Sequence, residues 1–169
     1  GAVENGGAGA VIRWAVVPTS LGQMLVAATE KGICRLSFDE TEEALADRFP
    51  KAQILPADAT TQALIEGAVQ AVENPSRMPD LPLDVAGTAF QEAVWQELRR
   101  IPIGETRTYA DIAAAVGKPK AVRAAGSANG ANNVAVLIPC HRVVRTDGTL
   151  GGYAYGLERK RILLKKEAT

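Results

Sequence analysis

The chain has 169 residues, of which 47% are hydrophobic and 22% are charged, and its formal net charge is zero. This length and composition are ordinary for a soluble globular protein with one domain or two small ones. No apolar run approaches the length of a membrane span, and no basic leader segment precedes a hydrophobic one, so we expect a cytoplasmic protein that does not contact a membrane.

The zero net charge hides two halves of opposite sign. Residues 1–87 contain 6 Lys and Arg and 12 Asp and Glu, whereas residues 88–169 contain 13 Lys and Arg and 7 Asp and Glu. Residues 75–87 contain three prolines, which is typical of an extended linker. We therefore expect a flexible tail over residues 1–9, an N-terminal structural domain with its linker over 10–87, and a basic domain over 88–169 that faces a polyanion. The alternative is a chance split over solvated surfaces.

The N-terminal half predicts a small sheet with helices. Short runs rich in β-branched residues, separated by turn residues, indicate strands at residues 11–17, 23–29 and 33–38. A helix is expected over residues 41–49, with Thr41 as its N-cap, and a second over 59–73, with Asp58 as its N-cap. Cys34 lies inside the third strand and is interpreted as a packing residue.

Two short helices in the basic half form a helix-turn-helix pattern. Thr108 caps a helix from Tyr109 to Val116, and a second helix is expected over residues 120–128. The second helix carries Lys120 and Arg123 together with small residues that let a nucleic-acid groove approach closely, namely Ala124, Ser127 and Ala128. A longer helix over residues 88–98 precedes this pair, with an apolar stripe that we assign to the core.

The most informative stretch is residues 134–145, V-A-V-L-I-P-C-H-R-V-V-R. Residues 134–138 predict a buried strand that ends at Pro139, because proline cannot donate a ladder hydrogen bond. Cys140 follows beside His141, the chain's only histidine. A cysteine reacts as its thiolate and needs a base, which His141 supplies if the chain turns or a water intervenes. The alternative is an inert buried cysteine beside a hydrogen-bonded histidine.

The C-terminal segment adds a loop and a helix. The loop G-G-Y-A-Y-G over residues 151–156 is either a plain turn or an aromatic wall for a flat ring. A basic helix follows over residues 157–166, with Ile162, Leu163 and Leu157 expected to face inward. Glu167 lies at the end that the helix dipole disfavours for an acid. It is therefore either a frayed, exposed acid or a partner of another group, such as His141.

The motif I-P-C-H-R-V-V at residues 138–144 resembles the active-site motif of the O6-alkylguanine-DNA alkyltransferases, also called methylated-DNA–protein-cysteine methyltransferases. R-V-V-R together with G-T-L-x-G-Y at residues 148–153 is most similar to the alkyltransferase domain of the bacterial Ada type. The likeness covers residues 88–167. It implies an α+β fold, in which a small ribonuclease-H-like sheet-plus-helix domain precedes a mostly helical domain with the helix-turn-helix.

The resemblance also implies direct-reversal DNA repair in the bacterial cytosol or nucleoid. An alkyl group, chiefly methyl, would pass from O6 of guanine, and also from O4 of thymine, in duplex DNA to Cys140, once per molecule and irreversibly. The catalytic residues it implies are Cys140, His141, Glu167, Tyr109 and Asn132. Arg123 would fill the gap left by a flipped base, with minor-groove contacts from Lys120, Tyr109, Ala124, Ser127 and Ala128. The substrate pocket would be formed by Val143, Gly152, Tyr153, Ala154 and Gly156.

No cofactor and no metal are expected, because one histidine and two cysteines cannot fill a four-ligand zinc site without carboxylates. The expected partner is double-stranded DNA, bound by a monomer. Asn133 and Ala135 stand where the family often has proline, and Ala154 stands where some relatives have serine. Two rivals remain: a DNA-binding damage sensor without transfer activity, and a Cys-His hydrolase. The hydrolase is disfavoured because the only histidine is adjacent to the cysteine.

Overall fold

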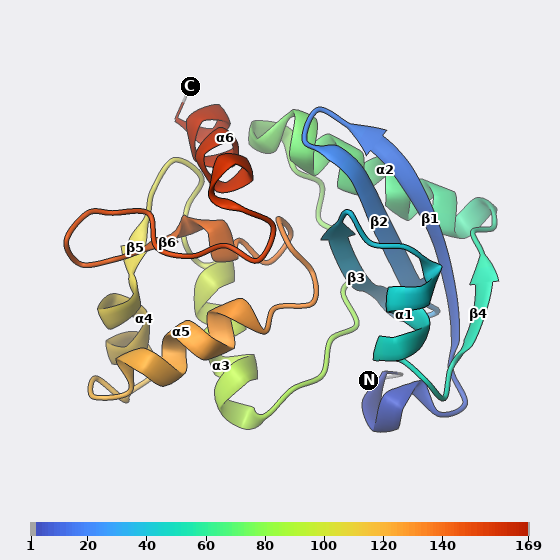
Figure 1. Cartoon of the computed structure of the whole chain (residues 1–169), viewed down its shortest axis with the longest axis horizontal. Helices are drawn as coiled ribbons and strands as arrows, with labels where there is room; N and C mark the ends of the chain where they lie inside the picture. Colours follow the sequence, from blue (N-terminus) through green and yellow to red (C-terminus); the bar gives the residue numbers. More distant parts are fainter. Residues whose placement is uncertain (1–2, 169) are drawn as a thin grey trace. The chain divides into compact units, whose positions relative to one another are not determined.

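The computed structural model describes residues 3–168, and the chain divides into two compact units with the boundary between Ala86 and Gly87 (Figure 1). The first unit is a sheet with helices, and the second is mostly helical. This arrangement confirms the α+β class that the sequence predicted.

The first unit is built on a four-stranded sheet in the order β3-β2-β1-β4. The strands are β1 (Val11–Thr19), β2 (Gly22–Thr29), β3 (Gly32–Phe38) and β4 (Gln53–Pro56). The first three form an antiparallel meander and match the predicted strands, whereas β4 runs parallel to β1. β4 was not predicted from the sequence, because this strand is four residues long and ends in a proline.

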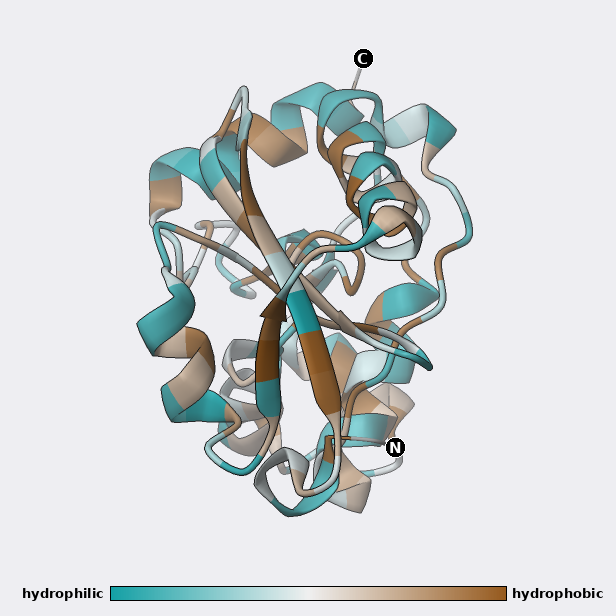
Figure 2. Cartoon of the chain, turned by 90° about the vertical axis from the view of Figure 1, so that its right-hand side faces the viewer, coloured by the Kyte–Doolittle hydropathy of each residue, from teal (hydrophilic) through white to brown (hydrophobic). Residues whose placement is uncertain are grey.

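Helices cover this sheet on both faces, which explains why most residues of β2 and β3 are buried. Leu25 and Ala27 belong to a buried cluster with Leu45 of α1 (Glu42–Arg48). Because side chains alternate along a strand, Met24 and Val26 point to the opposite face, where α2 (Ala59–Glu73) contacts β1 and β2. In Figure 2 the strands carry long hydrophobic stretches, while the helices alternate hydrophobic and hydrophilic bands.

The two ends of the first unit are more ordered than the sequence predicted. Glu4–Gly7 forms a 3-10 helix, and Val3 packs into the same buried cluster as Leu45, which differs from the expected tail over residues 1–9. Residues 1 and 2 lie outside the described part of the chain. The predicted linker, residues 75–87, begins with a 3-10 turn at Pro75–Arg77, and its Leu83 forms a parallel bridge with Ile33. Gly32 permits this approach, since a Cβ there would lie 2.5 Å from the Pro82 carbonyl.

Short helices dominate the second unit. Its elements are α3 (Ala89–Arg99), β5 (Arg107–Thr108), α4 (Tyr109–Ala115), α5 (Val122–Gly130), a 3-10 turn at Cys140–Arg142, β6 (Val143–Val144) and α6 (Leu157–Glu167). Thr88 and Thr108 each form a complete capping box, which fixes the first residues of α3 and α4. Trp95 of α3 donates from Nε1 to the Ala128 carbonyl at 2.9 Å and so joins α3 to α5.

The strand predicted over residues 134–138 is wrong, because these residues form a buried turn. The side chain of Asn132 takes the place of a neighbouring strand: Oδ1 accepts from Val134 N at 2.9 Å, and Nδ2 donates to the Ile138 carbonyl at 2.8 Å. Ile138 N closes the turn on the Val134 carbonyl at 3.0 Å. Val136 adopts a φ of 70°, which is a strained conformation for a β-branched residue.

One inward residue predicted for α6 is also wrong. Leu163 is buried, but Leu157 is 47% exposed. The buried face of α6 carries Lys160, Leu163 and Glu167, and Leu157 lies one turn before it, at the first residue of the helix.

Candidate active site

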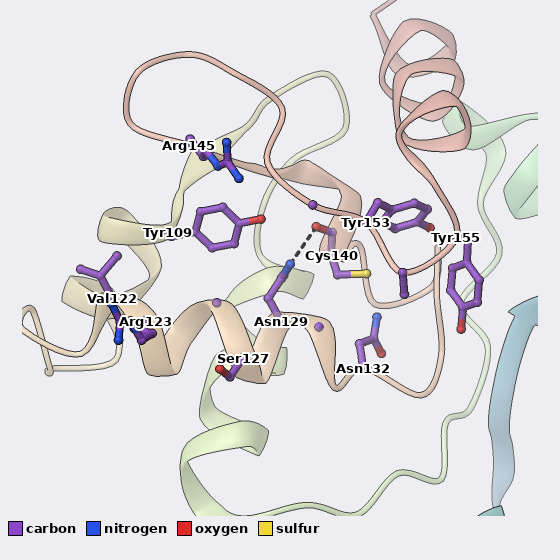
Figure 3. A pocket seen from close by; sticks show the side chains of 14 residues that line it. Tyr109, Val122, Arg123, Ser127, Asn129, Asn132, Cys140, Arg145, Tyr153 and Tyr155 are labelled. Atoms are coloured by element: carbon purple, nitrogen blue, oxygen red, sulfur yellow. Dashed lines mark hydrogen bonds between the residues drawn. The ribbon is translucent and has the colours of Figure 1, made fainter.

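A cavity of about 960 Å³ lies in the second unit, on the side where α4 and α5 meet the turn that carries Cys140 (Figure 3). α5 and the turn after it supply one wall, and the loop after β6 supplies the other. Its lining residues are Tyr109, Val122, Arg123, Gly126, Ser127, Asn129, Gly130, Asn132, Cys140, Arg145, Gly152, Tyr153, Ala154 and Tyr155.

Cys140 is 7% exposed and lies at the inner end of this cavity. It is the first residue of the 3-10 turn, and its backbone N–H donates to the Ile138 carbonyl at 2.7 Å. Asn129 Nδ2 donates to the Cys140 carbonyl at 3.3 Å and so holds the turn against α5. Burial raises the pKa of the Cys140 thiol, while a hydrogen bond from Asn132 and the charge of Lys160 oppose this rise. The resting side chain is therefore a thiol that needs a base.

His141 lies behind the cavity, not in its lining, and is fully buried. Its Nε2 lies 2.8 Å from Oε2 of Glu167. Burial lowers the pKa of His141, although the hydrogen bond to Glu167 acts in the opposite direction, so the imidazole is neutral at pH 7. Because a carboxylate can only accept, Nε2 carries the proton. Nδ1 makes no hydrogen bond among residues 3–168 and is left as the proton acceptor.

Glu167 also holds Arg142, a pairing that the sequence did not suggest. The guanidinium donates to both carboxylate oxygens at 2.9 Å and to the Ile101 carbonyl at 2.8 Å. Burial raises the pKa of Glu167, but hydrogen bonds from His141 and Arg142 outweigh it and hold that pKa at about 2. The carboxylate stays charged at neutral pH and fixes the orientation of His141.

Lys160 is a second buried cation near the site that was not predicted from the sequence. Its ammonium is fully buried and donates to three backbone carbonyls, those of Val143 at 2.6 Å, Gly152 at 3.1 Å and Leu150. Burial lowers its pKa to about 8. This side chain ties the loop at one wall of the cavity to β6. A signal was available, because a lysine three residues before Leu163 falls on the inward face of α6.

Tyr109 stands at the start of α4 with its phenol in the cavity. A Cβ on Gly151 would lie 2.8 Å from the Tyr109 hydroxyl, so a glycine with a φ of 72° permits this close approach. Burial raises the pKa of Tyr109, and the charge of Arg145 partly offsets this.

The predicted DNA-contacting residues of the second helix separate into three groups. Arg123 and Ser127 are exposed and line the cavity. Ala124 and Lys120 are exposed outside it, and Lys120 precedes α5, which begins at Val122. Ala128 differs from its expectation, because it is buried against α3.

The predicted pocket residues separate in the same way. Gly152, Tyr153 and Ala154 line the cavity. The rings of Tyr153 and Tyr155 pack edge to face, with 5.6 Å between their centroids. Val143 is fully buried behind the cavity, and Gly156 lies outside its lining. Several other residues line the cavity that were not predicted from the sequence: Val122, Gly126, Asn129, Gly130, Arg145 and Tyr155.

Within residues 3–168, no three His, Cys, Asp or Glu side chains gather where they could ligate a metal ion. None of the helices in this part of the chain combines the length and the apolar character needed to cross a bilayer. The other free cysteine, Cys34, is buried in the first unit, where burial raises its thiol pKa to about 12.

Two family models match the chain. "6-O-methylguanine DNA methyltransferase, DNA binding domain" matches residues 89–169, and "6-O-methylguanine DNA methyltransferase, ribonuclease-like domain" matches residues 12–75. The chain is 40% identical to the methylated-DNA–protein-cysteine methyltransferase of Methanosarcina barkeri, over 90% of this chain and 94% of that protein. It is 46% identical to the bifunctional transcriptional activator/DNA repair enzyme Ada of Escherichia coli, over 98% of this chain but 48% of Ada. The chain thus spans about half the length of that relative.

Solved structures of similar sequence also superpose on this chain. The crystal structure of Mycobacterium tuberculosis O6-methylguanine methyltransferase superposes with a TM-score of 0.76 at 32% identity, covering 94% of this chain and 93% of that one. The structure of M. tuberculosis OGT in complex with DNA superposes with a TM-score of 0.77 at 34% identity, covering 93% of this chain and 92% of that one.

Proposed function

The chain belongs to the 6-O-methylguanine DNA methyltransferase family, and we propose that it repairs alkylated duplex DNA by moving an alkyl group from O6 of guanine to the sulfur of Cys140. The observation that carries this proposal is the position of Cys140 at the inner end of a cavity on the helix-turn-helix side, with the buried His141–Glu167 pair behind it. A nucleophile so placed is reached by a base that leaves the DNA stack.

DNA binding begins at α5. Arg123 and Ser127 line the cavity mouth, and the small residues around them let the minor groove approach closely. An O6-alkylated guanine pairs poorly, which lowers the free energy needed to flip it into the cavity. Arg123 fills the gap in the stack, and the edge-to-face pair of Tyr153 and Tyr155 supports an apolar wall for the guanine ring.

The chemical step is an in-line displacement at the alkyl carbon. His141 Nδ1 takes the thiol proton through a water, and the Cys140 thiolate forms the new S–C bond as the C–O6 bond breaks. Tyr109 donates a hydrogen bond or proton to the departing guanine, which restores the normal base. Glu167 stabilises the imidazolium that forms, and Asn132 holds the turn that aims the sulfur.

The product is a thioether on Cys140, which none of the side chains lining the cavity can hydrolyse readily. We therefore propose that each molecule reacts once, as a methylated-DNA–protein-cysteine methyltransferase that is consumed by its own reaction. A monomer suffices, since every residue named in the reaction comes from the second unit. The first unit supports the fold, and O4-alkylthymine is a second substrate of the same site. We place this activity in the cytoplasm.

Intact-mass measurement tests the proposal directly. The wild-type chain and Cys140→Ser are each mixed with a duplex that carries one O6-methylguanine. We expect a mass increase of one methyl group in the wild type alone, saturating at one per chain. Unchanged mass with retained duplex binding would overturn the transfer function and favour a DNA-binding damage sensor instead.

A further inference from the structure

Arg145 is a cation of the cavity that the reaction just described does not use. It follows β6 directly and lines the cavity, and its side chain is exposed. Among residues 3–168 its guanidinium makes no hydrogen bond and no ion pair, although other arginines of the second unit pair with acids: Arg100 with Glu97, Arg142 with Glu167 and Arg161 with Glu158.

The backbone beneath Arg145 is fixed by a tight turn. Arg145 N donates to the Thr149 carbonyl at 3.0 Å, and Gly148 N donates to the Arg145 carbonyl at 3.0 Å. Asp147, the nearest acid in sequence, is held by Thr149 through its N–H at 2.9 Å and its hydroxyl at 2.6 Å. The turn thus presents Arg145 on an ordered backbone, and Asp147 interacts with the charge of Arg145 through space without forming an ion pair with it.

The charge of the cavity is one-sided. Its lining contains Arg123 and Arg145 and no Asp or Glu. The two arginines come from different elements, Arg123 from α5 and Arg145 from the loop after β6, with Tyr109 between them in Figure 3. Two unpaired guanidinium groups that face one opening favour an anionic ligand with more than one charge.

A flipped nucleotide supplies such a ligand at this place. Its base enters the cavity, while the phosphates on either side stay at the rim, because they remain part of the continuous strand. A guanidinium forms bidentate, charge-assisted hydrogen bonds with phosphate oxygens. Arg123 is already assigned to the gap in the stack, so the phosphate is left for a second cation.

We propose that Arg145 binds a backbone phosphate next to the flipped nucleotide and holds the extruded strand against the rim of the cavity. This role rests on the proposed function for its substrate, but its main consequence is seen in DNA binding itself. Arg145 contributes affinity for DNA and not the chemistry at Cys140, since the guanidinium meets a group that is unchanged between substrate and product.

The test compares Arg145→Ala with Arg161→Ala, which removes the same charge from an exposed arginine of α6 that lies outside the cavity lining. Equilibrium binding to an O6-methylguanine duplex is measured in a Cys140→Ser background at several salt concentrations, so that no transfer is needed. We expect Arg145→Ala to weaken binding about 5- to 10-fold and to reduce the slope of log K against log[salt] by about 0.9, the value for one lost phosphate contact. Arg161→Ala should leave that slope unchanged.

Single-turnover transfer with Cys140 present gives the second measurement. At saturating duplex, the maximal rate of Arg145→Ala should stay within about twofold of wild type. If Arg145→Ala keeps the wild-type slope of log K against log[salt] but transfers at a lower maximal rate, Arg145 does not bind a phosphate. It would then act on the chemical step through Tyr109. Absence of transfer in the wild type would refute the proposed function, while the binding measurement would still decide the role of Arg145.

Discussion

Nε2 of His141 lies 2.8 Å from Oε2 of Glu167, and the two side chains are 0% and 2% exposed. Both oxygens of the same carboxylate also accept hydrogen bonds from the Arg142 guanidinium. One acid at the last residue of α6 therefore orients the only histidine of the chain and neutralises a buried arginine. This double role lets function and stability be tested on one side chain.

Glu167→Gln should reduce both the alkyl-transfer rate and the stability. The amide cannot stabilise an imidazolium as a carboxylate does, so we expect the single-turnover rate to fall by about 10²-fold. Arg142 would keep its buried charge without an anionic partner, which should lower the unfolding free energy by about 3 kcal/mol. Chemical denaturation and rapid-quench transfer assays measure the two effects.

Glu158→Gln is the matched control, because Glu158 is an exposed acid at the other end of α6 that pairs with Arg161. Its stability should stay within about 0.5 kcal/mol of wild type. Equal transfer rates for Glu167→Gln and wild type would remove Glu167 from the mechanism and leave it a purely structural acid.

The second unit should lose stability in acid. The pKa of Glu167 is lowered from its ordinary 4.5 to about 2, so the stability it contributes is complete above pH 4.5 and disappears as the pH falls towards 2. The pKa of His141 is also lowered from its ordinary value of 6.5, so folding opposes its protonation and the loss begins as the pH falls below 6.5. Glu167→Gln should show a shallower decline between pH 4.5 and 2.

Each unit contains one tryptophan, so this pH dependence can be assigned. Trp14 lies in β1 and Trp95 in α3. In a Trp14→Phe variant, fluorescence reports the second unit alone. A transition seen by Trp95 that does not move between pH 6.5 and 2.5 would contradict the assignment of acid sensitivity to the His141–Glu167 pair.

Lys160→Met should slow transfer at neutral pH. Methionine keeps the apolar stem but removes the positive charge that opposes the rise in the Cys140 pKa, and it leaves three backbone carbonyls without their donor. We expect a loss of about 1–2 kcal/mol in stability and a thiol that alkylates with iodoacetamide only at higher pH. Lys165→Met, on the exposed face of α6, is the control and should behave as wild type.

Asn132→Ala should destabilise the turn before Cys140. The variant loses the hydrogen bonds to Val134 N and to the Ile138 carbonyl, both buried, which predicts a loss of about 2 kcal/mol. The effect on transfer should exceed the effect on duplex binding, because in the proposed mechanism the turn aims the sulfur while α5 binds the DNA. An unchanged transfer rate in folded Asn132→Ala would show that residues 134–138 hold the turn without this side chain.

Arg123→Ala should impair repair of duplex DNA more than repair of single strands. A single strand leaves no stacked gap to fill, so the rate for an O6-methylguanine oligonucleotide should change little, while the duplex rate should fall about tenfold. Lys118→Ala removes an exposed cation outside the cavity lining and serves as the control. Equal losses on both substrates would indicate a plain phosphate contact and not a role in filling the stack.

The helices and strands that were predicted correctly from the sequence are those that depend on residues close together in the chain. Asp58, Thr88 and Thr108 accept from backbone N–H groups three residues ahead, so α2, α3 and α4 begin at or within one residue of the predicted positions. The three antiparallel strands are joined by short turns and need only neighbouring residues to form. The cysteine–histidine motif identified the family for the same reason, since its residues are contiguous.

The turn before Cys140 and the buried contacts of Glu167 and Lys160 were decided only by the tertiary structure. The β-branched run at residues 134–138 favours a strand by propensity, but these residues form a turn, and the Asn132 side chain bonds to backbone groups at both ends of it. Glu167 meets His141 across 26 residues, and Lys160 meets the Val143 carbonyl across 17. A buried charge or backbone group must find a partner wherever the fold provides one, and local propensity acts over only a few residues.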